Sequence, residues 1–287
     1  MTMTTAKTVT TRNVTVGDHR LLLNEAGDPS RPAVLFLHGS GPGATGMSNW
    51  SAVLGDLSDD YYCLAPDVLG FGDSTHPNPP PQGLAAFTTA RVDSLIALLD
   101  VLGLERVTPV GNSMGGIWSL ELARRIPDRL DKIVLMGSGG APIPAGPSIP
   151  ALAGFYQKPS TEAMTALLEA FVYDPSLFGN ELRQVAERRM AHVSRPDVTR
   201  SHVATFAGLN ASDPWSLTPD EAAAITHEVL IVHGREDRFV TFDSALWFFE
   251  HLANARLYGI GKCGHWTQIE QHQRFVTALR EFLSDRL

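Results

Sequence analysis

Short apolar runs alternate with longer amphipathic stretches from residue 12 onward, and this alternation restricts the fold more than any other feature. Runs bounded by Gly, Pro or Asp are typical of buried strands, whereas the intervening stretches carry apolar residues at helical spacing. Repeated strand-helix-strand units build a mostly parallel sheet flanked by helices. The sequence therefore predicts an α/β fold with eight strands, at residues 13–16, 21–24, 33–37, 61–65, 106–110, 132–136, 229–233 and 255–258.

The first two runs differ from the rest because only Gly17 and Asp18, with their immediate neighbours, separate them. A connection this short joins antiparallel strands, so we expect a hairpin at the edge of the sheet. Helical patterns follow between the later strands, at 87–102, 116–125 and 271–283.

One insertion interrupts the alternation after the sixth strand. It opens with the Gly- and Pro-rich stretch 139–147, which cannot sustain regular structure, and continues with helical periodicity at 161–173 and 180–193. We expect residues 1–137 and 226–287 to form the core domain and residues 138–225 to form a helical cap, or lid. A helical excursion that only thickens the domain is the alternative, since long insertions are often but not always functional.

The composition excludes several classes of partner. The 287 residues carry a formal net charge of −8, and Lys and Arg are scattered, so no nucleic-acid surface is expected. Residues 1–7 are threonine-rich without the apolar segment of a signal peptide, and no apolar run reaches the roughly 20 residues that span a bilayer. We expect a cytoplasmic protein that acts on a small molecule.

The cysteine and histidine patterns give no indication of a metal centre. Cys63 and Cys263 are too few for a disulfide framework or a cysteine zinc site, and no HExxH sequence occurs among the ten histidines. We therefore expect neither a metal nor another cofactor.

The stretch Gly111-Asn112-Ser113-Met114-Gly115 matches G-x-S-x-G, the turn that exposes a nucleophilic serine in α/β-hydrolases. The motif alone is weak evidence, but here it follows a strand pattern and precedes a helical one, which is the context it requires. Pro109 is a mild objection to that strand, because proline removes a ladder N–H. We predict that Ser113 is the nucleophile.

A serine hydroxyl needs an adjacent base, and the base needs a group that holds its tautomer. Asp237 follows the seventh strand and His265 follows the eighth, which is the Ser, Asp, His order of this fold. Glu236 could replace Asp237 as the orienting acid. Among the other histidines, His233 is expected in the core, and His251 and His272 on solvated helix surfaces.

The loop His38-Gly39-Ser40-Gly41-Pro42-Gly43 follows the third strand. A glycine-rich loop at that position can bring backbone N–H groups close to a developing negative charge. The N–H groups of Ser40 and Met114 are therefore predicted to form the oxyanion hole. The loop could instead be only a turn.

Together, this loop, Gly111-Asn-Ser-Met-Gly-Gly, Gly234-Arg-Glu-Asp and Cys263-Gly-His-Trp resemble the meta-cleavage-product hydrolases of bacterial aromatic catabolism, over nearly the whole chain. The resemblance implies a C–C bond hydrolase that converts 2-hydroxy-6-oxo-hexa-2,4-dienoates into 2-hydroxypenta-2,4-dienoate and a carboxylic acid. It also implies a two-stage reaction, enol-to-keto tautomerisation and then hydrolytic cleavage, and it suggests a homodimer or a higher homo-oligomer. Whether serine or water attacks the ketone stays open, because both routes need the same residues.

The resemblance also implies substrate contacts. Asn49, Asn112, Trp266 and Gly41 would surround the dienoate end, and Arg189 would bind its carboxylate, with Arg188 as the alternative ligand. An arginine suits this role because its planar guanidinium can pair with a carboxylate through two hydrogen bonds.

The distal end of the substrate would meet apolar residues, for which we name Phe155, Trp215 and Val240, together with Leu168 and Phe171. Alkyl and aryl substituents are both compatible with such a pocket. A carboxylesterase of the same fold and a non-catalytic ligand-binding homologue are the competing functions, since fold does not determine function.

Overall fold

The computed structural model describes residues 8–209 and 215–287, so the threonine-rich segment 1–7 lies outside the described residues. Its described strands form one eight-stranded sheet in the order β1-β2-β4-β3-β5-β6-β7-β8. The strands are β1 (Thr10–Val16), β2 (His19–Ala26), β3 (Ala33–Leu37), β4 (Tyr62–Pro66), β5 (Thr108–Asn112), β6 (Ile133–Met136), β7 (Glu228–Gly234) and β8 (Asn254–Ile260).

The sheet is parallel except at one edge. β1 and β2 form an antiparallel hairpin around the turn at Gly17, and β2 also pairs antiparallel with β4, whereas all later pairs are parallel. The predicted α/β class and the eight strands are therefore confirmed. Pro109 is the second residue of β5, and pairing with β6 starts one residue later at Val110, so the missing N–H is accommodated at the beginning of the strand.

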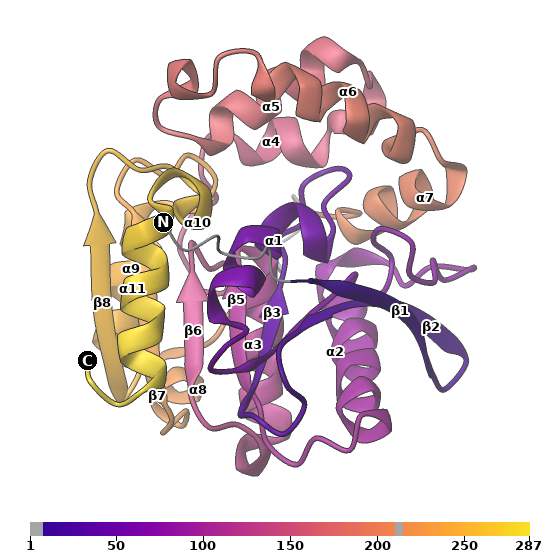
Figure 1. Ribbon diagram of the computed structural model, residues 1–287. Helices are drawn as coiled ribbons and strands as arrows, with labels where there is room; N and C mark the ends of the chain where they lie inside the picture. The colour runs from indigo at the N-terminus through magenta and orange to yellow at the C-terminus, as the bar shows by residue number, and fades with distance from the viewer. Residues whose placement is uncertain (1–7, 210–214) are drawn as a thin grey trace, which may run out of the picture.

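Helices cover both faces of the sheet, and the central strands β3 to β7 are accordingly buried along nearly their whole length (Figure 1). α1 (Gly46–Leu57) and α11 (His272–Leu283) enclose one apolar cluster, around Trp50 and Phe275. The other face carries α2 (Gly83–Val101), α3 (Met114–Arg125) and α9 (Phe242–His251), around Leu35, Trp118 and Phe248.

The residues between β6 and β7 supply a separate layer. α4 (Ile149–Ala153), α5 (Thr161–Phe171), α6 (Glu181–Val193) and α7 (Pro196–Thr205), here called the insertion helices, lie across the end of the sheet toward which the parallel strands point (Figure 1). Their own apolar cluster includes Leu168, Phe171 and Trp266. α8 (Pro219–Ala223) lies at the opposite end of the sheet, where Glu221 pairs with Arg124 of α3.

The remaining short elements are α10 (Thr267–Glu270) and the 3-10 turns η1 (Pro127–Arg129), η2 (Phe155–Gln157) and η3 (Pro175–Phe178). No helix in the described part of the chain is long and apolar enough to cross a membrane.

Candidate active site

Ser113 lies on a strained turn between β5 and α3. Its φ of 57° and ψ of −116° fall outside the regions that L-residues normally adopt. Tight packing explains the flanking glycines: a Cβ on Gly111 would lie 2.3 Å from the carbonyl oxygen of Gly115, and a Cβ on Gly115 would lie 2.2 Å from that of Leu37. This backbone is therefore the sharp strand-to-helix elbow that the motif predicts.

The three residues predicted as a triad meet beyond the carboxyl ends of β5, β7 and β8. His265 and Asp237 are linked by a hydrogen bond of 2.6 Å between imidazole Nδ1 and a carboxylate oxygen, and both side chains are almost fully buried. Ser113 and His265 line the same small cavity. Because Nδ1 donates to a carboxylate, Nε2 is left as the atom that can accept a proton.

The environment of Asp237 favours its charged form. Burial alone would raise its pKa, but the charge and hydrogen bond of His265, with the imidazole of His233 3.4 Å away, hold the pKa below its usual range. Its other oxygen accepts the N–H groups of Phe239 and Val240 at 2.8 and 3.0 Å. Three donors, the imidazole of His265 and these two backbone N–H groups, therefore fix the carboxylate.

The alternative acid and the other histidines occupy different environments. Glu236 accepts hydrogen bonds from Arg235 and from the N–H of Cys263, away from the imidazole of His265. His233 is buried, as expected, and donates to the carbonyl of Val240. His251 and His272 are half-buried rather than solvated, because each bonds a carbonyl one helical turn earlier.

The loop after β3 passes directly over the elbow. Ser40 and Gly41 line the cavity together with Ser113, and a Cβ on Gly39 would lie 3.2 Å from the Cβ of Ser113. Met114 is the first residue of α3, so its N–H has no acceptor within the helix. Both predicted oxyanion donors thus lie at the site, in elements that converge from β3 and β5.

Asn49 and Asn112 form a buried amide pair. The side-chain N–H of Asn49 donates to the side-chain oxygen of Asn112 at 2.9 Å, and Asn112 donates to the carbonyl of Met136 at 3.2 Å. Both side chains line the cavity of Ser113. The two amides therefore form a polar wall of that cavity, between α1 and the turn at Ser113.

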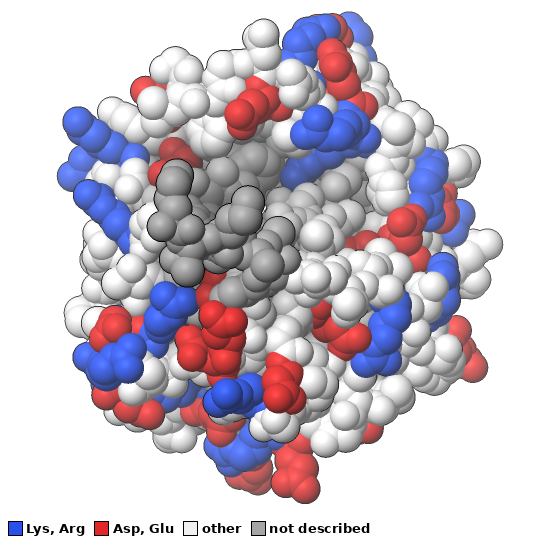
Figure 2. Space-filling model, viewed as in Figure 1, with Lys and Arg blue, Asp and Glu red and all other residues white. Residues whose placement is uncertain are grey.

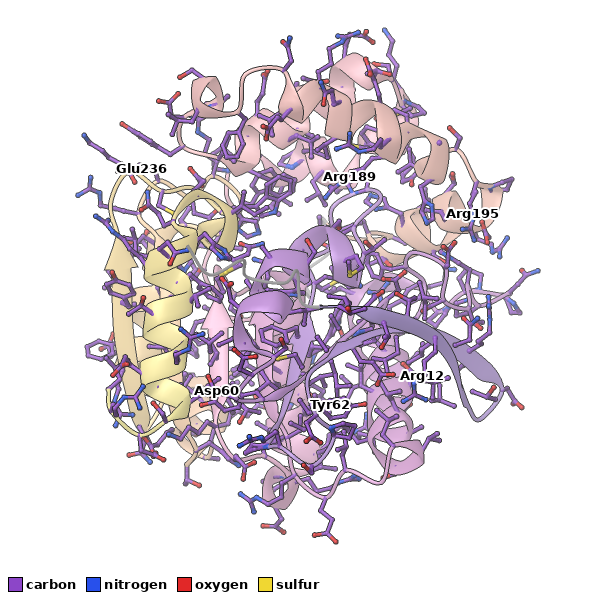
Figure 3. The ribbon with its side chains drawn as sticks, viewed as in Figure 1. Arg12, Asp60, Tyr62, Arg189, Arg195 and Glu236 are labelled. Atoms are coloured by element: carbon purple, nitrogen blue, oxygen red, sulfur yellow. The ribbon has the colours of Figure 1, made fainter. Side chains whose placement is uncertain are left out.

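Arg189 closes the cavity from above. It lies on the inner side of α6, 7% exposed, and its guanidinium carbon lies 5.4 Å from the centre of the Trp266 ring (Figure 3). Burial lowers its pKa to about 10, and no carboxylate among the described residues pairs with it. Arg188, the alternative ligand, is exposed and does not line this cavity.

Comparisons with known proteins place this geometry in a family. The model of the α/β-hydrolase fold matches residues 32–271. The chain is 37% identical, over 88% of its length and 87% of the relative's, to the 2-hydroxymuconate semialdehyde hydrolase of Pseudomonas sp. (strain CF600). It is 33% identical, over 98% and 97%, to the 2-hydroxy-6-oxo-6-phenylhexa-2,4-dienoate hydrolase of Burkholderia cepacia.

A solved structure agrees with these relatives. The 2-hydroxy-6-oxo-6-phenylhexa-2,4-dienoate hydrolase from Rhodococcus sp. strain RHA1 superposes with a TM-score of 0.93 at 34% identity, covering 97% of this chain and 99% of that one. The chain belongs to the meta-cleavage-product hydrolases. The predicted family and the prediction of a serine-dependent C–C hydrolase are thereby confirmed.

The residues predicted for the distal end of the substrate are scattered in this hydrolase. Phe155 is buried against Tyr156, Trp215 packs beside Gly140, and Val240 follows the Asp237 turn; none of the three lines the cavity of Ser113. Of the residues named for that end, Phe171 does line the cavity, and Leu152, Ala44 and Trp266 complete its apolar lining. The distal assignments therefore stay predictions.

Two further residues of the hydrolase contribute to the site. The sequence predicted Phe171 only as an apolar contact of the substrate, and it did not predict Glu270. The ring of Phe171 stacks on Trp266, with centroids 4.5 Å apart, and its carbonyl accepts the N–H of His265 at 2.7 Å. Glu270 accepts the N–H groups of Gly264 and Tyr173 at 2.7 and 2.6 Å. These contacts tie the His265 loop to the end of α5, and only the folded structure brings the segments together.

The hydrolase also buries a second cation without an acidic partner among the described residues, Arg91 of α2. It donates to the carbonyl of Leu69 and to the hydroxyl of Thr205 in α7, and its guanidinium lies 4.2 Å from the Phe87 ring. Burial lowers its pKa to about 9. Among the described residues, no group of three or more His, Cys, Asp or Glu side chains is arranged to hold a metal ion.

Proposed function

We propose that this chain hydrolyses the C5–C6 bond of 2-hydroxy-6-oxo-hexa-2,4-dienoates, producing 2-hydroxypenta-2,4-dienoate and a carboxylic acid. The observation that carries the proposal is Arg189, a buried arginine without an acidic partner among the described residues, in the wall of the cavity that holds Ser113 and His265. Burying an unpaired charge is costly, so such a group is expected where an anion binds. A simple ester substrate would bring no carboxylate to this position.

In the first stage, Arg189 would bind the carboxylate while the amides of Asn49 and Asn112 contact the neighbouring 2-hydroxyl. Loss of the 2-hydroxyl proton and gain of a proton at C5 convert the enol into the ketone. Carbon 5 is then a CH2 group between C4 and the C6 carbonyl. The tautomerisation matters because it prepares C5 to leave as a delocalised carbanion.

In the second stage, the oxygen of Ser113 would attack C6 while His265 takes its proton and the Ser40 and Met114 N–H groups receive the oxyanion. The C5–C6 bond then breaks, and its electron pair moves through C3=C4 onto the 2-oxygen, where a proton is returned. Water attacks the acyl-serine with His265 again as base. One water is consumed, and the acid and 2-hydroxypenta-2,4-dienoate are released.

The test is a panel of 6-methyl, 6-isopropyl and 6-phenyl dienoates, monitored by loss of their yellow absorption. We expect hydrolysis of at least one member and a fall in kcat/KM of about 10- to 100-fold for Arg189→Gln, the size of a charge-assisted pairing. Arg183→Gln, on the same helix but in an exposed pair with Glu187, is the matched control and should resemble the unaltered protein. A protein that hydrolyses short acyl esters but bleaches no dienoate would be a carboxylesterase.

The same proposal gives the insertion a role. Residues 138–225 would act as a cap over Ser113 through α4 to α7, with α8 returning to the core, and Phe155, Trp215 and Val240 would meet the distal substituent once the cavity widens. We also propose a homo-oligomer, which sedimentation velocity would test. A monomer at micromolar concentration would contradict this last point.

A further inference from the structure

Two cavities meet at Arg189 and Trp266. The inner one, around Ser113, is only about 10 Å³, which is room for about one water molecule. The outer one is about 470 Å³, within the range of small-molecule sites, and lies between α1, α6 and α10. Arg189 and Trp266 are the two residues that line both. A dienoate therefore fits the outer cavity but reaches Ser113 only when this pair moves.

The side chains of Arg189 and Trp266 separate the two cavities, and the contacts of Arg189 allow it to move. Arg189 is held by its contact with the Trp266 ring and with the loop at Gly43, where a Cβ would lie 3.3 Å from its side chain. Its Nε atom is buried without a hydrogen-bond partner. Because ion pairs with described residues are absent, displacing this guanidinium toward an incoming carboxylate breaks no salt bridge.

The outer cavity has the charge that a carboxylate requires. Arg188 and Arg189 line it with His192, and Glu181 is the acidic residue of its lining. The hydroxyl-bearing residues Ser48 and Ser51 of α1 face them. Basic side chains gather above the hollow between the insertion helices and the core (Figure 2). In a protein of net charge −8, this local positive region offsets the long-range repulsion that an anionic substrate meets.

We propose that the outer cavity is an entry chamber, in which Arg188 binds the carboxylate of the dienoate before Arg189 takes it over and Trp266 moves aside. The inference rests on the proposed function for the identity of the anion. It separates the roles of two adjacent arginines: Arg188 controls how fast the substrate enters and leaves, and Arg189 controls how tightly it is held at Ser113.

The test measures binding kinetics of the 6-phenyl dienoate by stopped-flow absorbance in the Ser113→Ala background, where the substrate binds without being cleaved. Arg188→Gln should lower the association and dissociation rate constants together, by about fivefold at low salt, and leave Kd within about threefold. The effect should vanish near 1 M salt, where the screening length is about 3 Å. Arg189→Gln should instead raise Kd by tenfold or more.

Two further variants distinguish the effect of charge from the effect of the space in the chamber. Arg183→Gln removes the same charge from the same helix outside the chamber, and should leave both rate constants unchanged. Ser51→Trp, at an exposed position of α1, fills the chamber without changing charge, and should slow entry and exit alike. Equal association rates for Arg188→Gln and Arg183→Gln would overturn the proposal, and so would a faster dissociation with a weaker Kd, since Arg188 would then be a ligand of the bound state.

The two proposals fail differently. If the protein with Ser113 intact bleaches no dienoate, the proposed function fails whatever the binding rates are. If it hydrolyses the dienoate but Arg188→Gln and Ser51→Trp enter at the rate of the parent, only the entry chamber fails.

Discussion

Gly137 follows β6 and lies against the hydrogen bond between His265 and Asp237. Its φ is +51°, and a Cβ there would lie 3.1 Å from Nδ1 of His265 and 3.2 Å from the carboxylate oxygen of Asp237. A side chain at this position would press on the imidazole and the carboxylate at once. The absence of a Cβ is therefore a requirement of the site as well as of the turn.

Gly137→Ala should lower kcat by 10-fold or more, because a small displacement of a catalytic base costs a large factor in rate. Gly17 is a matched control: its φ is +57°, and a Cβ there meets nothing within 4 Å. Both variants should lose about 1 kcal/mol of unfolding free energy from the left-handed backbone. Equal kcat values for the two variants, measured on the best dienoate, would show that Gly137 serves only the turn.

At the residue scale, local patterns predicted Ser113, Asp237 and His265 because each follows a strand end, and strand ends of a parallel sheet share one edge. Arg189 and Asn49 could not be derived that way. Arg189 belongs to an amphipathic helix whose neighbour Arg188 has the same local signature, and only packing decides which of the two is buried. Their selection rested on the family resemblance.

At the scale of elements, the end of α5 is joined to the loop that carries His265. Glu270 bridges the two through the N–H groups of Tyr173 and Gly264, while Phe171 stacks on Trp266. Any movement of α5 relative to the sheet therefore acts on the catalytic histidine loop. This clamp therefore couples the position of α5 to the alignment of His265.

Glu270→Gln should weaken the clamp, since a single amide oxygen cannot accept both N–H groups and the amide nitrogen would face a donor. We expect kcat to fall about tenfold and the unfolding free energy to fall by 1–3 kcal/mol. Measuring kcat well below the melting temperature separates misalignment from unfolding. Glu281→Gln, which removes the charge of a surface pair with Arg286, should retain the parental kcat; if Glu270→Gln retains it as well, the clamp has no catalytic role.

Elements were predicted well where the signal is local. Most predicted strands agree within two residues, because each is an apolar run between chain breakers. α1 was missed, although Trp50, Val53, Leu54 and Leu57 recur at helical spacing and Thr45 caps the helix with Ser48. Its glycines and serines obscured that signal. How the insertion helices lie on the sheet depends on contacts between distant segments, which no local pattern contains.

At the scale of the whole molecule, two buried neutral histidines make the free energy of unfolding depend on pH. His202 of α7 donates to the carbonyl of Leu152, and burial, with the charge of Arg91, lowers its pKa to about 4. Burial likewise lowers the pKa of His38 to about 4. Both values lie below the 6.5 of an unfolded histidine, so the unfolded chain binds more protons between these pH values.

The free energy of unfolding should therefore have its full value above pH 6.5. It should fall as the pH drops toward 4, by up to about 3 kcal/mol for each histidine. His202→Gln keeps a donor for Leu152 but cannot take up a proton, so its unfolding free energy should depend less steeply on pH. Urea denaturation at pH 7, 5.5 and 4.5 gives the comparison. Parallel curves for the two proteins would show that His202 does not contribute.

Cleavage of a C–C bond through Ser113 is tested most directly by product analysis in ¹⁸O-labelled water. With the 6-phenyl dienoate, we predict benzoate and 2-hydroxypenta-2,4-dienoate in equal amounts, with ¹⁸O in the new carboxylate, and loss of both products in Ser113→Ala. Intact dienoate after incubation with the unaltered protein, or unchanged turnover by Ser113→Ala, would contradict the account.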